Sequence, residues 1–297
     1  MSQAIFFGLA TFKLLFEKFD VLDVDHMPFF PLFSARVVTW LKGKKMYATW
    51  HEVWGRSYWF EYLKGPAGFL GYIIEQASFF LPDVIISNSE HTTALLRQAG
   101  VKQEIKTVPL GVDLENVYAA VPSREKSDII FVGRFLSHKN ADLLIRAVGM
   151  LNHLYPHITC KIIGDGPEKE NLKTLIGELE LQDNVQILDA IASHSILYGL
   201  MKSSKMLVLP SVREGFGLVA VEAFAAGIPV ITTRHKNNAA KDLILEGING
   251  FLTEPTARDI ADKIKKVLQS KDKLDPQREI EQYDWQMVAN RMEKILV

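Results

Sequence analysis

The chain has a single cysteine, Cys160, among its 297 residues, so no disulfide can form within it. Because Cys160 lies in the apolar run 158–163, we interpret it as a buried strand residue rather than a reactive thiol, which fits a reducing compartment. An excess of charge of one sign is also absent, because 34 Lys and Arg residues are balanced by 35 Asp and Glu residues, for a net charge of −1. The protein as a whole therefore gives no electrostatic reason to expect nucleic acid as a partner.

Long apolar runs are absent too, because none reaches the roughly 20 residues that span a bilayer. Residues 1–10 are largely apolar but do not begin with a basic segment, and the charged residues Lys13 and Glu17 follow soon after them. We therefore expect neither a signal peptide nor a transmembrane helix. This favours a cytoplasmic protein, with a peripheral position at the inner face of the membrane left open. No strand precedes a G-x-G-x-x-G sequence, which argues against a nucleotide-dependent dehydrogenase.

Short apolar runs alternate along the chain with apolar residues at helical spacing. We expect strands at 20–25, 45–50, 83–87, 105–108, 129–132, 161–163, 185–188, 206–209, 229–232 and 250–252. Strands that alternate with helices predict an α/β fold with doubly wound parallel sheets. Ligands of such sheets bind beyond the carboxyl ends of the strands. Gly133, Gly164 and Ser211 fall at those ends, so we expect them to converge.

The most informative stretch runs from Leu209 to Ile231 and predicts a strand, a glycine-bearing loop, an apolar helix and a second strand. It carries two carboxylates, Glu214 and Glu222, with seven residues between them. Glu222 is the only charged residue between Glu214 and Arg234, on a helix that should be buried. A buried carboxylate is costly unless it is paired or faces a ligand. The pattern indicates a pocket for a phosphorylated, hydroxyl-rich ligand such as a nucleotide sugar.

Two further strand-to-helix loops carry candidate binding residues. Arg134 and Lys139 flank a helix start in the first loop, where they could hold a diphosphate or be solvated cations. The second loop, 164–167, reads Gly-Asp-Gly-Pro and is unspecific when taken alone.

Together these loops resemble the retaining GT-B glycosyltransferases of family 4. The resemblance rests on Val132-Gly-Arg134 with Lys139, on Ile163-Gly-Asp-Gly-Pro167, on Pro210-Ser-Val-Arg-Glu-Gly-Phe-Gly-Leu218 and on Glu222-Ala-Phe-Ala-Ala-Gly-Ile-Pro-Val230. It covers roughly residues 20 to 297 and is strong from 128 to 255. It implies two Rossmann-like domains with parallel sheets, facing each other across a cleft.

The resemblance also implies roles for individual residues. It implies that Glu214 contacts the transferred sugar, that Glu222 holds ribose hydroxyls, and that Arg134 and Lys139 stabilise the leaving diphosphate. It further implies that His51, which follows the strand ending at Trp50, lines the site near the donor sugar. The remaining donor-binding positions would be Gly133, Gly164, Gly215, Phe216, Gly217 and Leu218.

The resemblance implies neither a metal nor another cofactor, because the nucleotide-diphosphate sugar is itself a substrate. Asp23-Val-Asp25-His26 is similar to the metal-binding Asp-x-Asp of a different glycosyltransferase fold, but here it ends a strand in a domain of the other type. The aromatic residues between Trp50 and Phe80 could contact a lipid-linked acceptor or a membrane, or fill the core or its rim.

We expect an amino-terminal, acceptor-side domain at 1–113 plus 277–297 and a donor-binding domain at 124–276. The first domain looks incomplete, because no strand with a glycine-rich loop precedes Asp20. A second departure is the polar segment 234–242, which has no glycine where the family commonly has a glycine-containing turn.

The leading hypothesis is a retaining glycosyltransferase that moves a sugar from a nucleotide-diphosphate sugar to a glycan, lipid-linked or small-molecule acceptor. The alternative is a non-catalytic nucleotide-sugar binding protein or a subunit of a heteromeric glycosyltransferase. The sequence does not identify the base, the sugar, the acceptor, the linkage or the oligomeric state.

Overall fold

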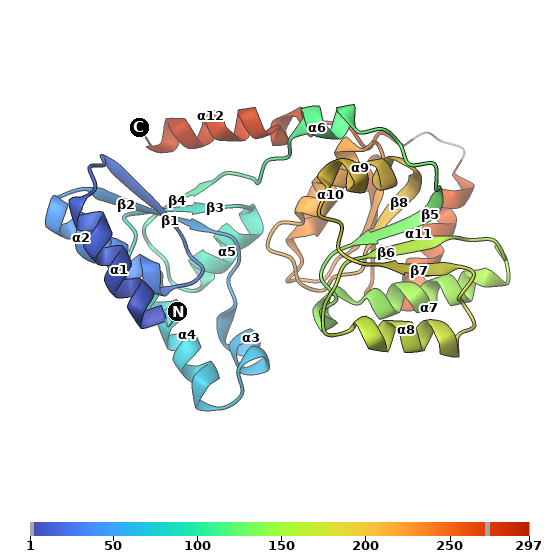
Figure 1. The fold of residues 1–297 in the computed structure, drawn as a ribbon, viewed down its shortest axis with the longest axis horizontal. Coiled ribbons are helices and arrows are strands. Elements are labelled where there is room, and N and C mark those ends of the chain that lie inside the picture. Colours follow the sequence, from blue (N-terminus) through green and yellow to red (C-terminus); the bar gives the residue numbers. More distant parts are fainter. Residues whose placement is uncertain (1–2, 271–273, 297) are drawn as a thin grey trace. The chain divides into compact units, whose positions relative to one another are not determined.

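The computed structural model describes residues 3–270 and 274–296. Two compact units make up the chain (Figure 1). Unit 1 comprises Met1–Leu110 and Val288–Val297, and unit 2 comprises Gly111–Met287. Each unit is built on one parallel β-sheet with helices packed against it, so the predicted α/β class with two parallel-sheet domains is confirmed.

Unit 1 is built on a four-stranded parallel sheet in the order β1-β2-β3-β4. The strands are β1 (Val21–Asp25), β2 (Lys45–Trp50), β3 (Val84–Ser87) and β4 (Glu104–Thr107). The helices are α1 (Gln3–Phe16), α2 (Phe30–Lys42), α3 (Gly55–Tyr62), α4 (Pro66–Ser78) and α5 (Glu90–Gln98). From Val288 onward, α12 (Trp285–Leu296) belongs to this unit, where Val288 packs with Tyr47 and Ile86 of the sheet.

The aromatic segment after β2 forms the helical hairpin α3–α4, in which part of its side chains are buried and part exposed. Trp59 of α3 packs where Gly71 of α4 has no side chain, because a Cβ on Gly71 would lie 2.2 Å from the Trp59 ring. The buried Glu75 carboxylate accepts hydrogen bonds from the backbone N–H of Trp54 (2.7 Å) and Gly55 (2.9 Å) and from Trp59 Nε1 (3.0 Å). This carboxylate therefore fixes the start of α3, where unpaired N–H groups favour an anion.

Unit 2 is built on a six-stranded parallel sheet in the order β10-β9-β8-β5-β6-β7. Its strands are β5 (Ser127–Val132), β6 (Cys160–Ile163), β7 (Val185–Leu188), β8 (Ser204–Leu209), β9 (Val230–Thr233) and β10 (Gly250–Thr253). Its α-helices are α6 (Leu114–Ala119), α7 (Ala141–Asn152), α8 (Lys169–Glu178), α9 (His194–Lys202), α10 (Leu218–Ala225) and α11 (Ala257–Gln269). Three 3₁₀ helices complete it, η1 (Ser137–Lys139), η2 (Ala239–Leu243) and η3 (Ile280–Tyr283).

The order of the strands in unit 2 indicates where a ligand would bind. The chain proceeds from β5 to β6 and β7 on one side, whereas β8, β9 and β10 lie on the other side of β5. The strand order therefore switches direction at β5, and ligands of doubly wound sheets bind beyond the carboxyl ends of the strands at such a switch. Cys160 is buried at the start of β6, and no helix in the described part of the chain is long and apolar enough to cross a membrane.

Candidate active site

The loops that follow β5 and β6 line a cavity of about 480 Å³ at the carboxyl edge of the unit 2 sheet. Gly133 and Arg134 come from the first loop, and Gly164 comes from the second. The remaining lining residues are Val132, Ile163, Asp165, Gly166, Ala190, Ile191 and Leu197. The side chain of Arg134 is exposed. The cavity thus combines one cation with glycine backbone, and an anionic group can approach both.

Gly164 is required by the close approach of these two loops. A Cβ on Gly164 would lie 1.9 Å from the carbonyl oxygen of Gly133. The backbone N–H of Gly133 donates to the carbonyl of Ile163 (3.0 Å), which joins the ends of the two strands. A larger residue would force the loops apart and open the floor of the cavity.

Lys139 and Glu214 form an ion pair, with 2.7 Å between Nζ and Oε1. Their side chains are only 18% and 10% exposed. Lys139 ends η1 after β5, and Glu214 lies in the loop after β8, so the pair joins the two sides of the strand-order switch. Sequence reasoning proposed a role for each residue but did not predict this contact. The pair presents a positive and a negative group side by side next to the cavity loops.

Two hydrogen bonds hold the loops that carry this ion pair. The backbone N–H of Val212 donates to the carbonyl of His138 (2.9 Å), and Asn140 Nδ2 donates to the carbonyl of Pro210 (3.1 Å). Asn140 itself has φ of 51°, a left-handed conformation that asparagine tolerates better than most residues. The positions of Lys139 and Glu214 are therefore set by backbone contacts as well as by their charges.

The segment after β9 fixes the backbone of Glu214 through the buried Asn238. The N–H of Glu214 donates to the carbonyl of Asn237 (3.1 Å), and its carbonyl accepts from Ala239 (3.0 Å). Asn238 Nδ2 donates to the Thr233 carbonyl (2.7 Å) and to Thr232 Oγ1 (3.0 Å), while its Oδ1 accepts from the N–H of Ala240 (3.1 Å). The Asn238 amide thus holds the backbone of segment 234–242, which contains no glycine.

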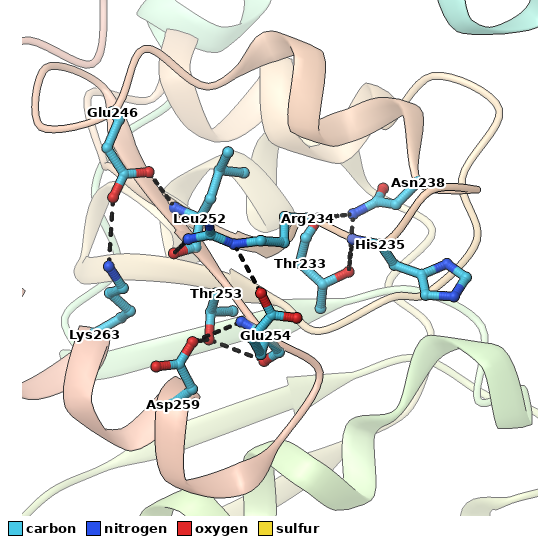
Figure 2. Close-up of polar contacts among 10 residues, drawn as sticks. All are labelled: Thr233, Arg234, His235, Asn238, Glu246, Leu252, Thr253, Glu254, Asp259 and Lys263. Carbon is cyan, nitrogen blue, oxygen red and sulfur yellow. Dashed lines mark hydrogen bonds and ion pairs between the residues drawn. The ribbon is translucent and has the colours of Figure 1, made fainter.

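Figure 2 shows how the same segment is joined to β10. Arg234 Nε lies 3.2 Å from Glu254 Oε1. The carboxylate of Asp259 accepts from the N–H of Glu254 (2.6 Å) and from Thr253 Oγ1 (2.9 Å). The hydrogen bond from the Glu254 backbone is the main reason why the pKa of Asp259 lies below its usual value. These contacts hold the edge of the sheet in unit 2 and leave Arg234 paired.

Glu222 lies on α10, half-buried between buried apolar neighbours that include Val221 and Ala223. Its Oε1 accepts a hydrogen bond from the hydroxyl of Tyr198 on α9 (3.3 Å). Burial raises the pKa of Glu222, and the bond from Tyr198 opposes that rise. Burial and the neighbouring Glu222 carboxylate raise the pKa of the Tyr198 phenol. Sequence reasoning missed Tyr198 because nothing local distinguishes it from a core aromatic residue.

The turn between Glu214 and α10 consists of Gly215, Phe216 and Gly217, and the helix begins at Leu218. Gly217 has φ of 96°, and a Cβ there would lie 2.5 Å from Cβ of Ala240. Phe216 is buried, with its ring centroid 6.1 Å from that of Tyr283. Leu218 begins the helix and is exposed. Glycine at 217 therefore allows η2 to pack directly on the start of α10.

His51 lies in unit 1, directly after β2. Its Nε2 lies 3.0 Å from Oδ1 of Asp25. Asp23, two residues earlier on β1, instead accepts from Thr49 Oγ1 (2.9 Å). In the described ranges no group of three or more histidine, cysteine and acidic side chains is arranged to hold a metal.

The two halves of the chain match family models of known glycosyltransferases. Residues 119–296 match the family model "Glycosyl transferases group 1", and residues 3–116 match "Glycosyltransferase Family 4". A sequence relative is the phosphatidylinositol N-acetylglucosaminyltransferase gpi3 subunit of Schizosaccharomyces pombe, 28% identical over 71% of this chain and 47% of that protein. Another is an uncharacterized glycosyltransferase of Haemophilus influenzae, 36% identical over 44% of this chain and 36% of that protein. The chain thus spans less than half the length of these relatives.

Solved structures share the fold. Anabaena Alr3699/HepE in complex with UDP superposes with a TM-score of 0.80 at 19% identity, over 99% of this chain and 81% of that chain. Sucrose-phosphate synthase from Thermosynechococcus elongatus also gives a TM-score of 0.80, at 21% identity, over 99% of this chain and 77% of that chain. These likenesses agree with the two parallel-sheet units. The chain belongs to the glycosyl transferases group 1 family and has a GT-B fold.

Proposed function

We propose that this protein is a retaining glycosyltransferase that moves a sugar from a nucleotide-diphosphate sugar to a glycan, lipid-linked or small-molecule acceptor. The observation that carries the proposal is the convergence of the loops after β5, β6 and β8 at one edge of the unit 2 sheet. Those loops place Arg134 in the lining of a cavity and carry the ion pair between Lys139 and Glu214. A UDP complex of a protein with the same fold makes uridine nucleotides the first ligands to test.

The proposed chemistry follows from where charge develops. Breaking the bond between sugar and phosphate places negative charge on the leaving diphosphate, and cations fixed in advance lower that barrier. Arg134 and Lys139 would supply those cations, and the glycine backbone at 133 and 164 would let the phosphates approach. The Glu214 carboxylate would accept hydrogen bonds from hydroxyls of the transferred sugar.

Glu222 would hold the ribose of the donor. A half-buried carboxylate with one phenol partner keeps free acceptor capacity for a pair of hydroxyl donors. The backbone N–H groups from Gly215 to Leu218 lie at the start of α10, where an anion or a sugar oxygen is favoured. In this proposal neither a metal nor another cofactor takes part.

Turnover with product analysis tests the proposal. The chain is incubated with UDP-glucose, UDP-N-acetylglucosamine or GDP-mannose and a panel of acceptor sugars, and release of nucleoside diphosphate is measured. Proton NMR of the product then gives the anomeric configuration. Release with the donor configuration kept supports the proposal, and an inverted product refutes the retaining mechanism. Donor binding without release favours the alternative, a non-catalytic binding protein or a subunit of a heteromeric enzyme.

We further propose that the hairpin α3–α4 makes peripheral contact with a membrane in a cytoplasmic protein. Phe69 and Leu70 of α4 are 54% and 60% exposed, and Tyr62 at the end of α3 is exposed as well. Lys64, between the two helices, is a cation that can accompany these residues to an anionic surface. Replacing Phe69 and Leu70 by serine should reduce co-sedimentation with vesicles that contain phosphatidylserine. Unchanged sedimentation would refute this contact.

A further inference from the structure

The segment Asp23–His26 at the end of β1 is built around the strand beside it. Asp23 and Asp25 lie on the same face of β1, because side chains alternate along a strand. In the parallel register they are opposite Tyr47 and Thr49 of β2. Asp23 accepts from Thr49 Oγ1 (2.9 Å), and Oδ1 of Asp25 lies 3.0 Å from Nε2 of His51. The two carboxylates therefore contact Thr49 near the end of β2 and His51 just beyond it.

His26 holds the backbone of the same histidine. It is 2% exposed, and its ring stacks on Trp50 with 5.0 Å between centroids. The backbone N–H of His51 donates to Nδ1 of His26 (3.3 Å). Burial lowers the pKa of His26 to about 3, so the ring is neutral at physiological pH and can accept through Nδ1. Both the backbone and the ring of His51 are thus fixed by residues of one short segment.

The contact with Asp25 decides which ring nitrogen of His51 carries the proton. A carboxylate only accepts hydrogen bonds, so Nε2 of His51 must be the donor. In the neutral ring, Nδ1 then has no proton and is an acceptor. His51 is 39% exposed, and within the described residues no group bonds to Nδ1. In this neutral form Nδ1 can accept a hydrogen bond from a hydroxyl but has no hydrogen to donate to a phosphate oxygen.

We propose that Asp25 and His26 are positioning residues that fix His51 as an acceptor, through Nδ1, for a hydroxyl group of a substrate. This inference rests on the proposed transferase function. It accounts for the Asp-x-Asp-His sequence without a metal: Asp25 orients the ring, His26 anchors the backbone and Asp23 ties the two strands together.

The test is Asp25→Asn, with Asp23→Asn as its matched control on the same face of β1. The asparagine amide can donate to Nε2, which favours the wrong tautomer of His51. Ring ¹⁵N NMR shifts of His51 report the tautomer, and release of nucleoside diphosphate from UDP-glucose, UDP-N-acetylglucosamine or GDP-mannose reports turnover. We expect Asp25→Asn to move the proton to Nδ1 and to lower kcat about 10- to 100-fold, with the affinity for free nucleoside diphosphate unchanged. Asp23→Asn should change neither.

Each result decides the inference. A wild-type His51 with its proton on Nδ1 overturns it, and so does a tautomer change in Asp25→Asn that leaves kcat unaltered. An equal loss of kcat in Asp23→Asn shows that the segment acts only through the fold and also overturns it. If the wild-type chain releases no nucleoside diphosphate, the proposed function fails instead, and the wild-type tautomer alone then supports or refutes the positioning of the ring.

Discussion

The ion pair between Lys139 and Glu214 gives a sharp stability prediction. At 2.7 Å and an effective dielectric constant of about 20, Coulomb's law gives an attraction of about 6 kcal/mol. Desolvation of two largely buried groups offsets much of that attraction. Removing one partner leaves the other charge unpaired at 10–18% exposure, which costs about 3 kcal/mol. Lys139→Met should therefore lower the free energy of unfolding by about 3 kcal/mol.

A double-mutant cycle measures this coupling. Lys139→Met, Glu214→Gln and the double variant are unfolded in urea and followed by circular dichroism. Because the double variant leaves no unpaired charge, it should recover about 2 kcal/mol relative to the sum of the single changes. Lys173→Met is the control, because its ion pair with Glu170 is exposed and should matter by less than about 0.5 kcal/mol. Single changes that are strictly additive would refute the reasoning.

Three further predictions concern the supports of the site. Gly217→Ala should lower the free energy of unfolding by about 2–4 kcal/mol, because of the positive φ and the close approach of Ala240. Gly247→Ala, at a positive φ in open space, should lower it by only about 1 kcal/mol. Thermal unfolding measures both. Asn238→Ala should cost about 2–3 kcal/mol and speed hydrogen exchange of the Ala239 amide, and unaltered exchange would count against the proposed anchor. The pKa of His26 is lower in the folded protein than in the unfolded chain. Below pH 6.5 the unfolded chain therefore binds more protons at this residue than the folded protein does. The wild type should lose up to about 1.4 kcal/mol per pH unit relative to His26→Gln between pH 6.5 and about 3, and parallel pH curves would refute this.

The local patterns of the sequence predicted the main features of the fold. The apolar runs at β5, β6 and β8 are buried strands, because a strand covered on both faces needs a continuous apolar sequence. The loops at Gly133 and Gly164 could be placed at one edge because parallel strands end on the same side. These inferences need only neighbours in sequence and the rules of βαβ connection.

Contacts between distant residues could not be predicted in the same way. Lys139 and Glu214 are separated by 75 positions, and their pairing depends on how two loops are held after folding. Tyr198 beside Glu222 has no local signature. The buried Glu75 has no local signature either, yet its carboxylate accepts hydrogen bonds from the backbone at the start of α3. Polar partners within a core are chosen by tertiary packing, which periodicity does not encode.

We propose that the unit 2 site binds the diphosphate and the ribose of a nucleotide donor. Calorimetric titration of the intact chain with UDP, GDP and ADP tests it most directly, with Glu222→Ala and Arg134→Ala as variants and Arg234→Ala, at the paired arginine beside β10, as a control. We expect one of the three nucleotides to bind clearly, with an affinity that each of the two site variants weakens at least about 10-fold and that the control leaves unchanged. Wild-type affinity retained in Glu222→Ala, or no binding of any of the three nucleotides, would contradict it.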